Sequence, residues 1–163
     1  LDTVLVHEKV ARNFLPVMFQ RLHTAGVSLR LDEVSQEILG VDQNLGLEPA
    51  REEDFDREWL SLILGVRVVK GLEEAVDHIW SHSTFHSDGI LTENKANANR
   101  FMNAVDSAAV YVNASTRFTD GSQFGLGGEV AISTQRLHAR GPIGLEGLTT
   151  YKWIVEGDYT VRL

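Results

Sequence analysis

The segment from Val110 to Gly128 holds the residue types best suited to binding a polar ligand. It opens with a short apolar run, 110–112, that is rich in β-branched and aromatic residues. The run then changes abruptly into hydroxyls, an amide, one arginine and closely spaced glycines, which is how a buried strand delivers a polar loop. In open α/β sheets, ligands bind where such strands end.

Arg117 is the residue in this loop with the clearest binding chemistry. Its neighbours are hydroxyl residues, namely Ser115, Thr116 and Thr119. A guanidinium in this setting, with backbone amides freed by nearby glycines, can recognise a carboxylate or a phosphate through paired hydrogen bonds. The same residues also form ordinary turns, in which Arg117 would pair with Asp120. The residues alone leave both interpretations open.

Three histidines recur at four-residue spacing and raise the question of a metal site. They are His78, His82 and His86, and two of them could share one helix face. The chain has no cysteine, however, and Ser83 and Thr84 favour a helix end before His86. We therefore expect helix-end and loop histidines and no metal.

Of two other catalytic patterns, a hydrolase triad fits the residues weakly and a dinucleotide-binding loop does not fit them. His86, Ser87 and Asp88 are the residue types of a hydrolase triad, but adjacency should point their side chains apart, and no Gly-x-Ser-x-Gly turn exposes a serine. The glycines at 121, 125, 127 and 128 do not stand between a strand and a helix in the order of a dinucleotide fingerprint. Neither chemistry is predicted.

Strand and helix patterns alternate along most of the chain. Strands are expected at 3–6, 27–31, the end of 59–69, 89–91 and 108–112, and helices at 8–25, 32–39, 72–81 and 92–105. Asp32 and Thr92 are the expected caps of two helices. The alternation predicts an α/β fold with a mostly parallel sheet and helices on both faces. From Leu148 to Val161, Thr, Tyr, Trp and Val alternate with polar residues, which predicts either two short terminal strands or one long bent strand.

Composition narrows the possible partners. With 163 residues, 43% of them hydrophobic, the chain can bury one sizeable core. The net charge of −8 disfavours nucleic acids and anionic membranes, and no apolar run is long enough to cross a bilayer, so a soluble, cytoplasmic protein is expected. Residues 1–106 carry 10 Lys/Arg against 18 Asp/Glu, whereas 107–163 carry 5 of each. The loop-bearing third is therefore neutral and could hold an anion.

Several motifs together resemble one enzyme family. They are Val69, Ala75, Val76, His78, Ile79, His82, Ser83 and Thr84 leading to His86-Ser87-Asp88, then Asn-Ala-Ser-Thr-Arg-Phe-Thr-Asp-Gly at 113–121, Phe-Gly-Leu-Gly at 124–127 and His-Ala-Arg-Gly-Pro at 138–142. In these motifs the chain resembles the γ-glutamyl phosphate reductases, also called glutamate-5-semialdehyde dehydrogenases, of the aldehyde dehydrogenase superfamily. The resemblance runs from Leu1 to the C-terminus and is weakest at 40–56.

The resemblance implies an activity and a cofactor. The family reduces L-glutamyl 5-phosphate to L-glutamate 5-semialdehyde with NADPH and releases phosphate, in proline biosynthesis from glutamate. A cysteine thiolate attacks the acyl phosphate, and the resulting thioester accepts hydride, which is the logic of covalent catalysis. The family's cysteine precedes the residues that correspond to Leu1-Asp2-Thr3. We therefore expect a C-terminal catalytic-domain fragment whose nucleophile and most of whose NADPH site lie before Leu1.

Roles for residues of this chain follow from the same resemblance. Glu58 resembles the superfamily glutamate that contacts the nicotinamide ribose, although Trp59-Leu60-Ser61 departs from the usual Ile-Phe-Gly. The substrate-binding residues implied are Asn113, Ser115, Thr116, Arg117, Phe124 and Gly125. Residues 1–147 would form the catalytic domain, and 148–163 a strand segment that pairs at an oligomer interface.

Partners follow in the same way, and one alternative stays open. The resemblance implies L-glutamyl 5-phosphate as the small-molecule substrate, a homo-oligomer, and an association with glutamate 5-kinase, either as a separate protein or as a fused domain. A different class of function is a non-catalytic assembly or regulatory domain that keeps the fold. A cysteine two to four positions before Leu1 would favour the enzyme.

Overall fold

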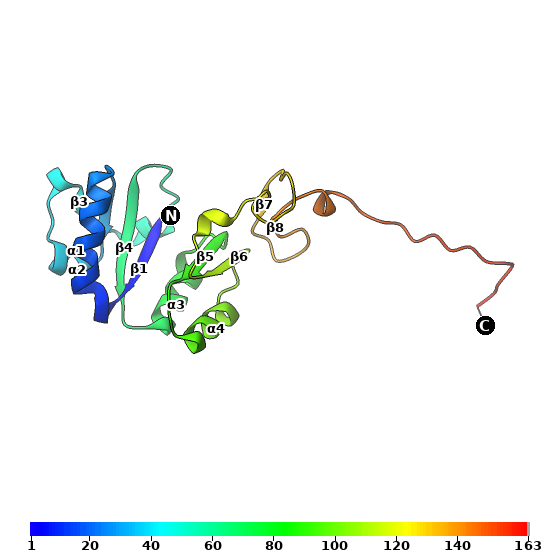
Figure 1. Ribbon diagram of the computed structural model, residues 1–163, viewed down its shortest axis with the longest axis horizontal. Coiled ribbons are helices and arrows are strands. Elements are labelled where there is room, and N and C mark those ends of the chain that lie inside the picture. The colour runs from blue at the N-terminus through cyan, green and yellow to red at the C-terminus, as the bar shows by residue number, and fades with distance from the viewer. Residues whose placement is uncertain (163) are drawn as a thin grey trace.

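The main sheet of the protein is parallel. The computed structural model describes residues 1–162 (Figure 1). Four strands pair in the order β1-β4-β2-β3, and every neighbouring pair is parallel. They are β1 (Thr3–His7), β2 (Ser28–Leu31), β3 (Leu47–Pro49) and β4 (Ile63–Val69). The α/β fold with a mostly parallel sheet that the sequence predicts is confirmed.

Two smaller sheets follow along the chain. β5 (Ser87–Ile90) and β6 (Ala109–Val112) are parallel, whereas β7 (Ile132–Ser133) and β8 (Gly141–Pro142) are antiparallel. The α-helices are α1 (Glu8–Thr24), α2 (Glu33–Leu39), α3 (Leu72–His82) and α4 (Lys95–Ala104). Four short 3₁₀ turns complete the described chain: η1 (Gln43–Leu45), η2 (Glu52–Asp56), η3 (Thr116–Phe118) and η4 (Glu146–Leu148).

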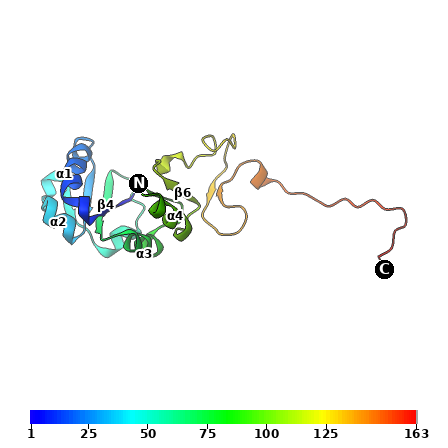
Figure 2. The same cartoon turned by 60° about the horizontal axis from the view of Figure 1, so that its bottom comes forward.

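Strand β1 contributes to two hydrophobic clusters because successive side chains of a strand point to opposite faces. Val4 and Val6 pack into the cluster that α1 covers, where Leu15 is fully buried. Leu5 packs into the other cluster, around Ile79 of α3 and Phe101 of α4. Burial of one such leucine contributes about 2 kcal/mol. Helices therefore lie on both faces of the sheet, as Figure 2 also shows.

Asp32 connects α2 to the sheet. Its Oδ1 accepts a hydrogen bond from the Ser35 backbone N–H at 2.9 Å, which caps the helix as the sequence predicts. Its Oδ2 accepts from the Val68 N–H of β4 at 3.1 Å, a contact that the sequence did not predict. One carboxylate thus satisfies a helix end and a strand end.

The cap predicted at Thr92 is wrong. Helix α4 is capped by Asn94, whose Oδ1 accepts from the N–H groups of Ala96 and Asn97 at 2.9 and 3.1 Å. The Thr92 hydroxyl instead accepts a hydrogen bond from the Asn94 N–H at 3.1 Å. The Thr92 backbone exchanges two hydrogen bonds with the side-chain amide of Asn113. Asparagine is at least as good a cap as threonine, and it lies two residues closer to the helix.

The C-terminal segment extends away from the rest of the molecule (Figures 1 and 2). Residues 149–162 pair with no strand within the described chain, so the predicted terminal strand is unpaired here. Its large side chains are exposed, and Trp153 and Val155 are 85% and 90% exposed. An extended segment forms a strand only when a partner supplies the other half of the hydrogen bonds.

The helices of the described residues were also compared with the length and apolarity of membrane-spanning helices. None of the helices within residues 1–162 combines the length and the apolar character that a bilayer requires.

Replacing Asp32 tests its double contact. Asp32→Ala should lower the free energy of unfolding by roughly 2 to 3 kcal/mol, because it removes a helix cap and leaves a strand N–H unpaired. Asp42→Ala is the matched control, since the Asp42 carboxylate accepts only the Asn44 N–H of an exposed turn. Urea unfolding followed by circular dichroism measures both. Equal losses in the two variants would contradict the role given to Asp32.

Candidate functional site

The polar loop that the sequence singled out begins at the end of β6 and is fixed there by Asn113. This residue has a φ of 54°, in the left-handed region where asparagine is tolerated. Its side-chain amide exchanges two hydrogen bonds with the Thr92 backbone, both 2.8 Å long, and its own N–H donates to the Ile90 oxygen. Asn113 therefore acts here as a tether for the loop, and its substrate contact stays a prediction.

Ser115 caps the turn η3, which contains Thr116 and Arg117. The Ser115 hydroxyl accepts the Arg117 backbone N–H at 3.2 Å, and the Phe118 N–H donates to the Ser115 carbonyl at 3.1 Å. These bonds use main-chain donors and leave the guanidinium free. The Arg117 side chain is exposed and makes no ion pair with any residue of the described chain.

The internal pairing of Arg117 with Asp120, left open by the sequence, does not occur. The Asp120 carboxylate instead accepts hydrogen bonds from the hydroxyl and N–H of Ser122 and from the Gln123 N–H. These donors, Ser122 first, hold the pKa of Asp120 below its usual value. A stable anion thus closes the following turn, and Arg117 stays available for an external one.

Phe124 and Gly125 lie in the turn that follows. The Phe124 and Gly125 N–H groups donate to the carbonyls of Asp120 and Ser122, and Gly125 has a φ of 76°, which favours glycine. The turn closes where the Gly121 N–H donates to Glu129 Oε2 at 2.8 Å. Gly125 also borders an open cavity of about 430 Å³, whose other lining residues are Leu126, His138, Ala139, Arg140, Pro142, Ile143, Gly144, Leu145, Glu146 and Gly147.

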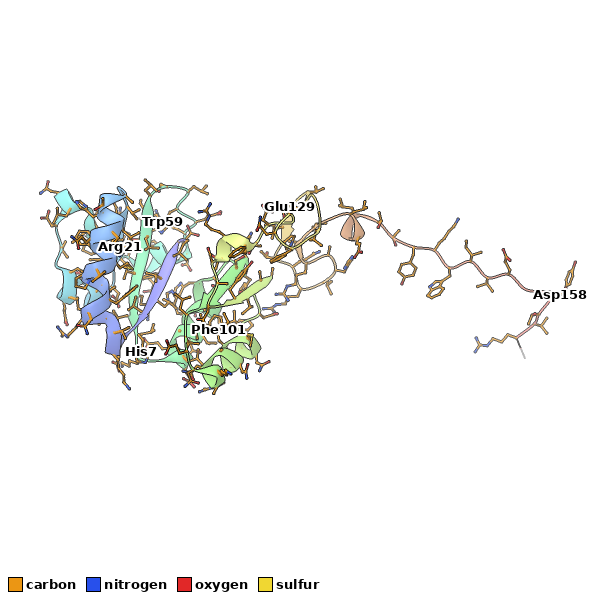
Figure 3. The ribbon with its side chains drawn as sticks, viewed as in Figure 1. His7, Arg21, Trp59, Phe101, Glu129 and Asp158 are labelled. Carbon is orange, nitrogen blue, oxygen red and sulfur yellow. The ribbon has the colours of Figure 1, made fainter. Side chains whose placement is uncertain are left out.

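The segment that carries Glu58 lies close in space to the first residues of the chain. The Asp2 carboxylate accepts the N–H of the next residue, Trp59, at 3.2 Å, and the Asp2 carbonyl accepts the Gly65 N–H of β4 at 2.8 Å. The Trp59 ring is covered by the guanidinium groups of Arg30 and Arg57, 5.7 and 5.9 Å from its centre. Figure 3 shows Trp59 near the upper end of β1. The Glu58 side chain is exposed at this end.

The chain start and the loop lie at the same end of the molecule. The N-terminus lies beside η3 in both views (Figures 1 and 2). Through Asp2, the segment that carries Glu58 reaches the same place. The structure therefore brings together three regions that are far apart in sequence: the start of the chain, residue 58 and residues 115–118.

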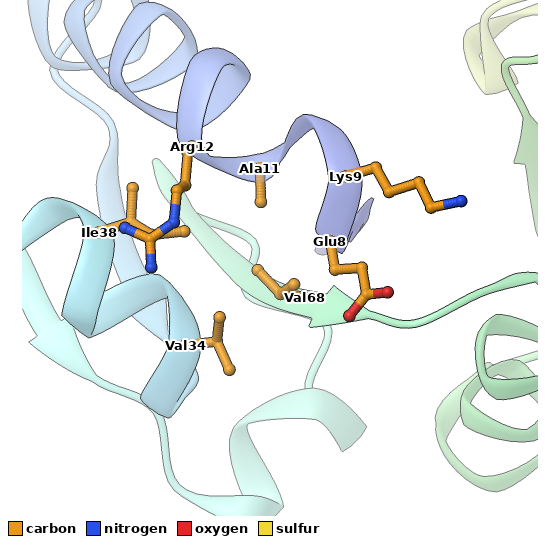
Figure 4. Close-up of a pocket in the computed structure, with 7 residues that line it drawn as sticks. All are labelled: Glu8, Lys9, Ala11, Arg12, Val34, Ile38 and Val68. Atoms are coloured by element: carbon orange, nitrogen blue, oxygen red, sulfur yellow. The ribbon is translucent and has the colours of Figure 1, made fainter.

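A second cavity lies at the opposite ends of β1 and β4. It measures about 340 Å³ and is lined by Glu8, Lys9, Ala11, Arg12, Val34, Ile38 and Val68 (Figure 4). Val68 lies near the carboxyl end of β4, and Glu8 begins α1 directly after β1. None of the site residues that the sequence singled out line it, so it is separate from the candidate site.

His86 and Ser87 are in contact, contrary to the expectation from adjacency. His86 Nδ1 lies 2.8 Å from the Ser87 hydroxyl, because the ring of one residue turns back onto the next. Asp88 takes no part, since its Oδ2 accepts hydrogen bonds from Ser83 at 2.6 Å and Ser107 at 2.5 Å. The three side chains therefore do not form a triad.

The other two histidines pack between α3 and η2. The His82 imidazole lies 2.8 Å from Asp56 and 3.7 Å from Glu52, whereas His78 is buried against the edge of the Phe55 ring. Within residues 1–162 no group of three or more His, Cys, Asp or Glu side chains is placed to hold a metal ion. The role of the two is to pack one turn against a helix.

His78 makes the fold sensitive to acid. Only 7% of this residue is exposed, and its Nδ1 has no hydrogen-bond partner within the described chain. Burial, followed by the charges of His82 and Arg67, lowers the pKa of His78 from 6.5 to about 4. The folded protein therefore holds this imidazole neutral at pH values where the unfolded chain would protonate it.

The pH dependence of stability tests this assignment. The contribution of neutral His78 should be complete above about pH 6.5 and decline as the pH falls towards about 4, by roughly 3 kcal/mol at most. In His78→Phe that decline should disappear from the pH profile of the unfolding free energy. His23→Phe, at an exposed position, is the control and should keep it. A profile of His78→Phe that matches the control would contradict the assignment.

Comparison with known proteins reveals close relatives over the whole chain. No family model matches the chain. The chain is 59% identical over 162 residues to a γ-glutamyl phosphate reductase of Shewanella pealeana and 56% identical to one of Kosmotoga olearia. Each match covers 99% of this chain and 38% of the relative. The chain thus spans little more than a third of the length of the curated relatives.

Solved structures agree with the fold. A crystal structure of γ-glutamyl phosphate reductase from Thermotoga maritima has a TM-score of 0.92 and 53% identity, with 99% of this chain and 38% of that chain covered. A propionaldehyde dehydrogenase from Clostridium phytofermentans has a TM-score of 0.59 at 18% identity, with 91% and 41% covered, and supports the fold alone. The resemblance of the sequence to the γ-glutamyl phosphate reductases is therefore confirmed for the part of those proteins that this chain spans.

Proposed function

We propose that this chain, which over its whole length is related to one part of the γ-glutamyl phosphate reductases, forms the C-terminal catalytic region of such a reductase. The reaction is the NADPH-dependent reduction of L-glutamyl 5-phosphate to L-glutamate 5-semialdehyde with release of phosphate, in proline biosynthesis. The observation that carries the proposal is the exposed, unpaired guanidinium of Arg117 on a tethered turn beside the start of the chain.

The substrate's charge explains the need for this arginine. An acyl phosphate of glutamate carries carboxylate and phosphate groups, and a guanidinium binds either through two parallel hydrogen bonds. The segment from residue 107 onward has equal numbers of acidic and basic side chains, so it does not repel such an anion as the acidic first part would. Arg117, with the Ser115 and Thr116 side chains beside it, is proposed to orient the substrate.

In this proposal the nucleophile and most of the cofactor contacts come from outside these 163 residues. The chain contains no cysteine, so the thiolate that would attack the acyl carbon and release phosphate is not one of its side chains. Glu58, exposed near the chain start, fits a contact with a ribose hydroxyl, because a carboxylate accepts hydrogen bonds from hydroxyls. When bound, NADPH supplies the hydride that reduces the thioester.

The proposal also includes self-association of the chain and a kinase that supplies the substrate. The exposed segment 149–162, with its row of large apolar side chains, is proposed to pair with another copy of the chain, as unpaired strands do. The substrate is an acyl phosphate, so a glutamate 5-kinase is the proposed source, as a separate enzyme or a fused domain. The alternative is a non-catalytic assembly domain. It would be favoured if the complete protein lacked a cysteine two to four positions before Leu1.

Arg117 is the residue to change first. In a complete reductase that carries this segment, Arg117→Ala should lower kcat/KM for the acyl phosphate by roughly 1.5 to 3 kcal/mol of transition-state binding. Arg12→Ala is the control, because Arg12 lines the cavity at the other end of the sheet. Steady-state kinetics measure both. Unchanged kinetics in Arg117→Ala would defeat the anchoring role.

The proposed pairing of residues 149–162 with another copy of the chain can be tested by changing apolar and charged residues of this segment separately. Replacing Trp153 and Val155 by serine should shift the assembled protein towards smaller species, because it removes apolar area from the proposed interface. Replacing Lys152 and Glu156 by serine is the matched control and should leave the mass unchanged. Analytical ultracentrifugation of both double variants decides, and an unchanged mass in the first pair would contradict the proposed pairing.

A further inference from the structure

The hydroxyl of Thr119 joins three segments of the chain. It lies 2.6 Å from the Ser87 hydroxyl at the start of β5 and 2.7 Å from the Tyr111 hydroxyl of β6. Ser87 in turn contacts His86 Nδ1 at 2.8 Å. Four polar side chains therefore form one continuous hydrogen-bonded row, with Thr119 as the member that belongs to the loop.

Thr119 directly follows η3 and lies two residues after Arg117. On the other side of the turn, Asn113 is tethered to Thr92. The segment that bears the guanidinium is therefore held at both ends, at 113 and at 119, and side-chain hydrogen bonds contribute to both tethers. If the second tether were absent, the next contacts that fix the chain would be those of Asp120 with Ser122 and of Gly121 with Glu129, both of which are local to the following turn.

Gly89 of β5 provides the space in which this arrangement fits. A Cβ at Gly89 would lie 3.2 Å from the Tyr111 Cβ and 3.7 Å from the methyl group of Thr116. The first distance is shorter than an ordinary van der Waals contact, so Tyr111 would have to move. The glycine thus allows the turn to lie close to the strand and the Tyr111 hydroxyl to reach Thr119.

The chemistry of a hydroxyl makes Thr119 hard to replace. Its hydroxyl can donate one hydrogen bond and accept two, so it can serve both partners at once, and either oxygen of each pair can be the donor. All three side chains are partly buried. Removing the Thr119 hydroxyl would leave two hydroxyls without that partner, which costs more than the loss of one exposed hydrogen bond.

We propose that Thr119 is the positioning residue of the Arg117 turn: through Ser87 and Tyr111 it fixes the turn on β5 and β6 and so sets where the guanidinium points. Thr119 does not itself touch the substrate. That the positioned group is an acyl phosphate rests on the proposed function, whereas the tether is a property of this chain alone.

The first test concerns the tether and needs no substrate. In Thr119→Val, hydrogen exchange of the Phe118 and Thr119 amides, which donate to Ser115 and Thr116 at 3.1 Å, should accelerate about tenfold. Amides of β4 should be unaffected. Thr119→Ser keeps the hydroxyl and should restore slow exchange. Thr134→Val is the matched control, because Thr134 is exposed and lies outside the Arg117 turn.

Smaller changes cover the case in which Thr119→Val does not fold. Ser87→Ala and Tyr111→Phe each remove one of the two contacts, so each should accelerate exchange at the same amides by a smaller factor. Unchanged exchange at Phe118 and Thr119 in the folded variants would overturn the proposal, whatever the activity of the protein.

The second test concerns the substrate and separates the two proposals. In a complete reductase, Thr119→Val should raise KM for the acyl phosphate several-fold and change kcat less, and Thr119→Ser should recover the KM. If Thr119→Val accelerates exchange but neither it nor Arg117→Ala alters the kinetics, the tether stands and the substrate-anchoring role proposed for Arg117 fails. If Arg117→Ala is impaired and Thr119→Val is normal in exchange and KM, the positioning role fails alone.

Discussion

The alternating side chains of β1 hold the two hydrophobic clusters of the protein together. Val4 and Val6 enter the cluster under α1 and α2, and Leu5 enters the cluster of α3 and α4. β1 therefore joins two halves that otherwise build separate sheets. Because the side-chain period of a strand is two, a shift of one residue would move every apolar group to the wrong face. Asp2, directly before this strand, accepts a hydrogen bond from the Trp59 N–H and so places Glu58 near the chain start.

The candidate site is held mainly by side-chain hydrogen bonds and only in small part by backbone hydrogen bonds between strands. Beyond β6 the chain follows Asn113, Thr119, Asp120 and Gly121, and each is fixed by a polar group: the Thr92 backbone, the Ser87 and Tyr111 hydroxyls, the Ser122 donors and the Glu129 carboxylate. A loop tethered in this way can keep one charged side chain unpaired without losing its shape. Arg117 is that side chain, and preorganisation of this kind reduces the entropy that binding would otherwise cost.

The sequence predicted what depends on local periodicity and on motif. The alternating helices and strands, the cap at Asp32 and the polar loop after β6 were all visible, because each is encoded within about ten neighbouring residues. Contacts across long separations were not: Ser87 meets Thr119 at a separation of 32 residues, and Asp2 meets Trp59 at 57. Strands β3, β7 and β8 are two or three residues long and carry no period to detect. The choice between Asn94 and Thr92 as cap needed the geometry of both.

In the proposed function the tethered turn presents Arg117 to an external anion. Phosphate titration of this chain, followed by the NMR signals of the arginine Nε–H groups and of the amides at 116–118, tests it most directly. We expect a saturable shift of the Arg117 Nε–H signal and of those amides, and we expect the Arg117→Ala variant to lose the amide shifts. Shifts confined to other arginines such as Arg12, or equal amide shifts in Arg117→Ala, would contradict it.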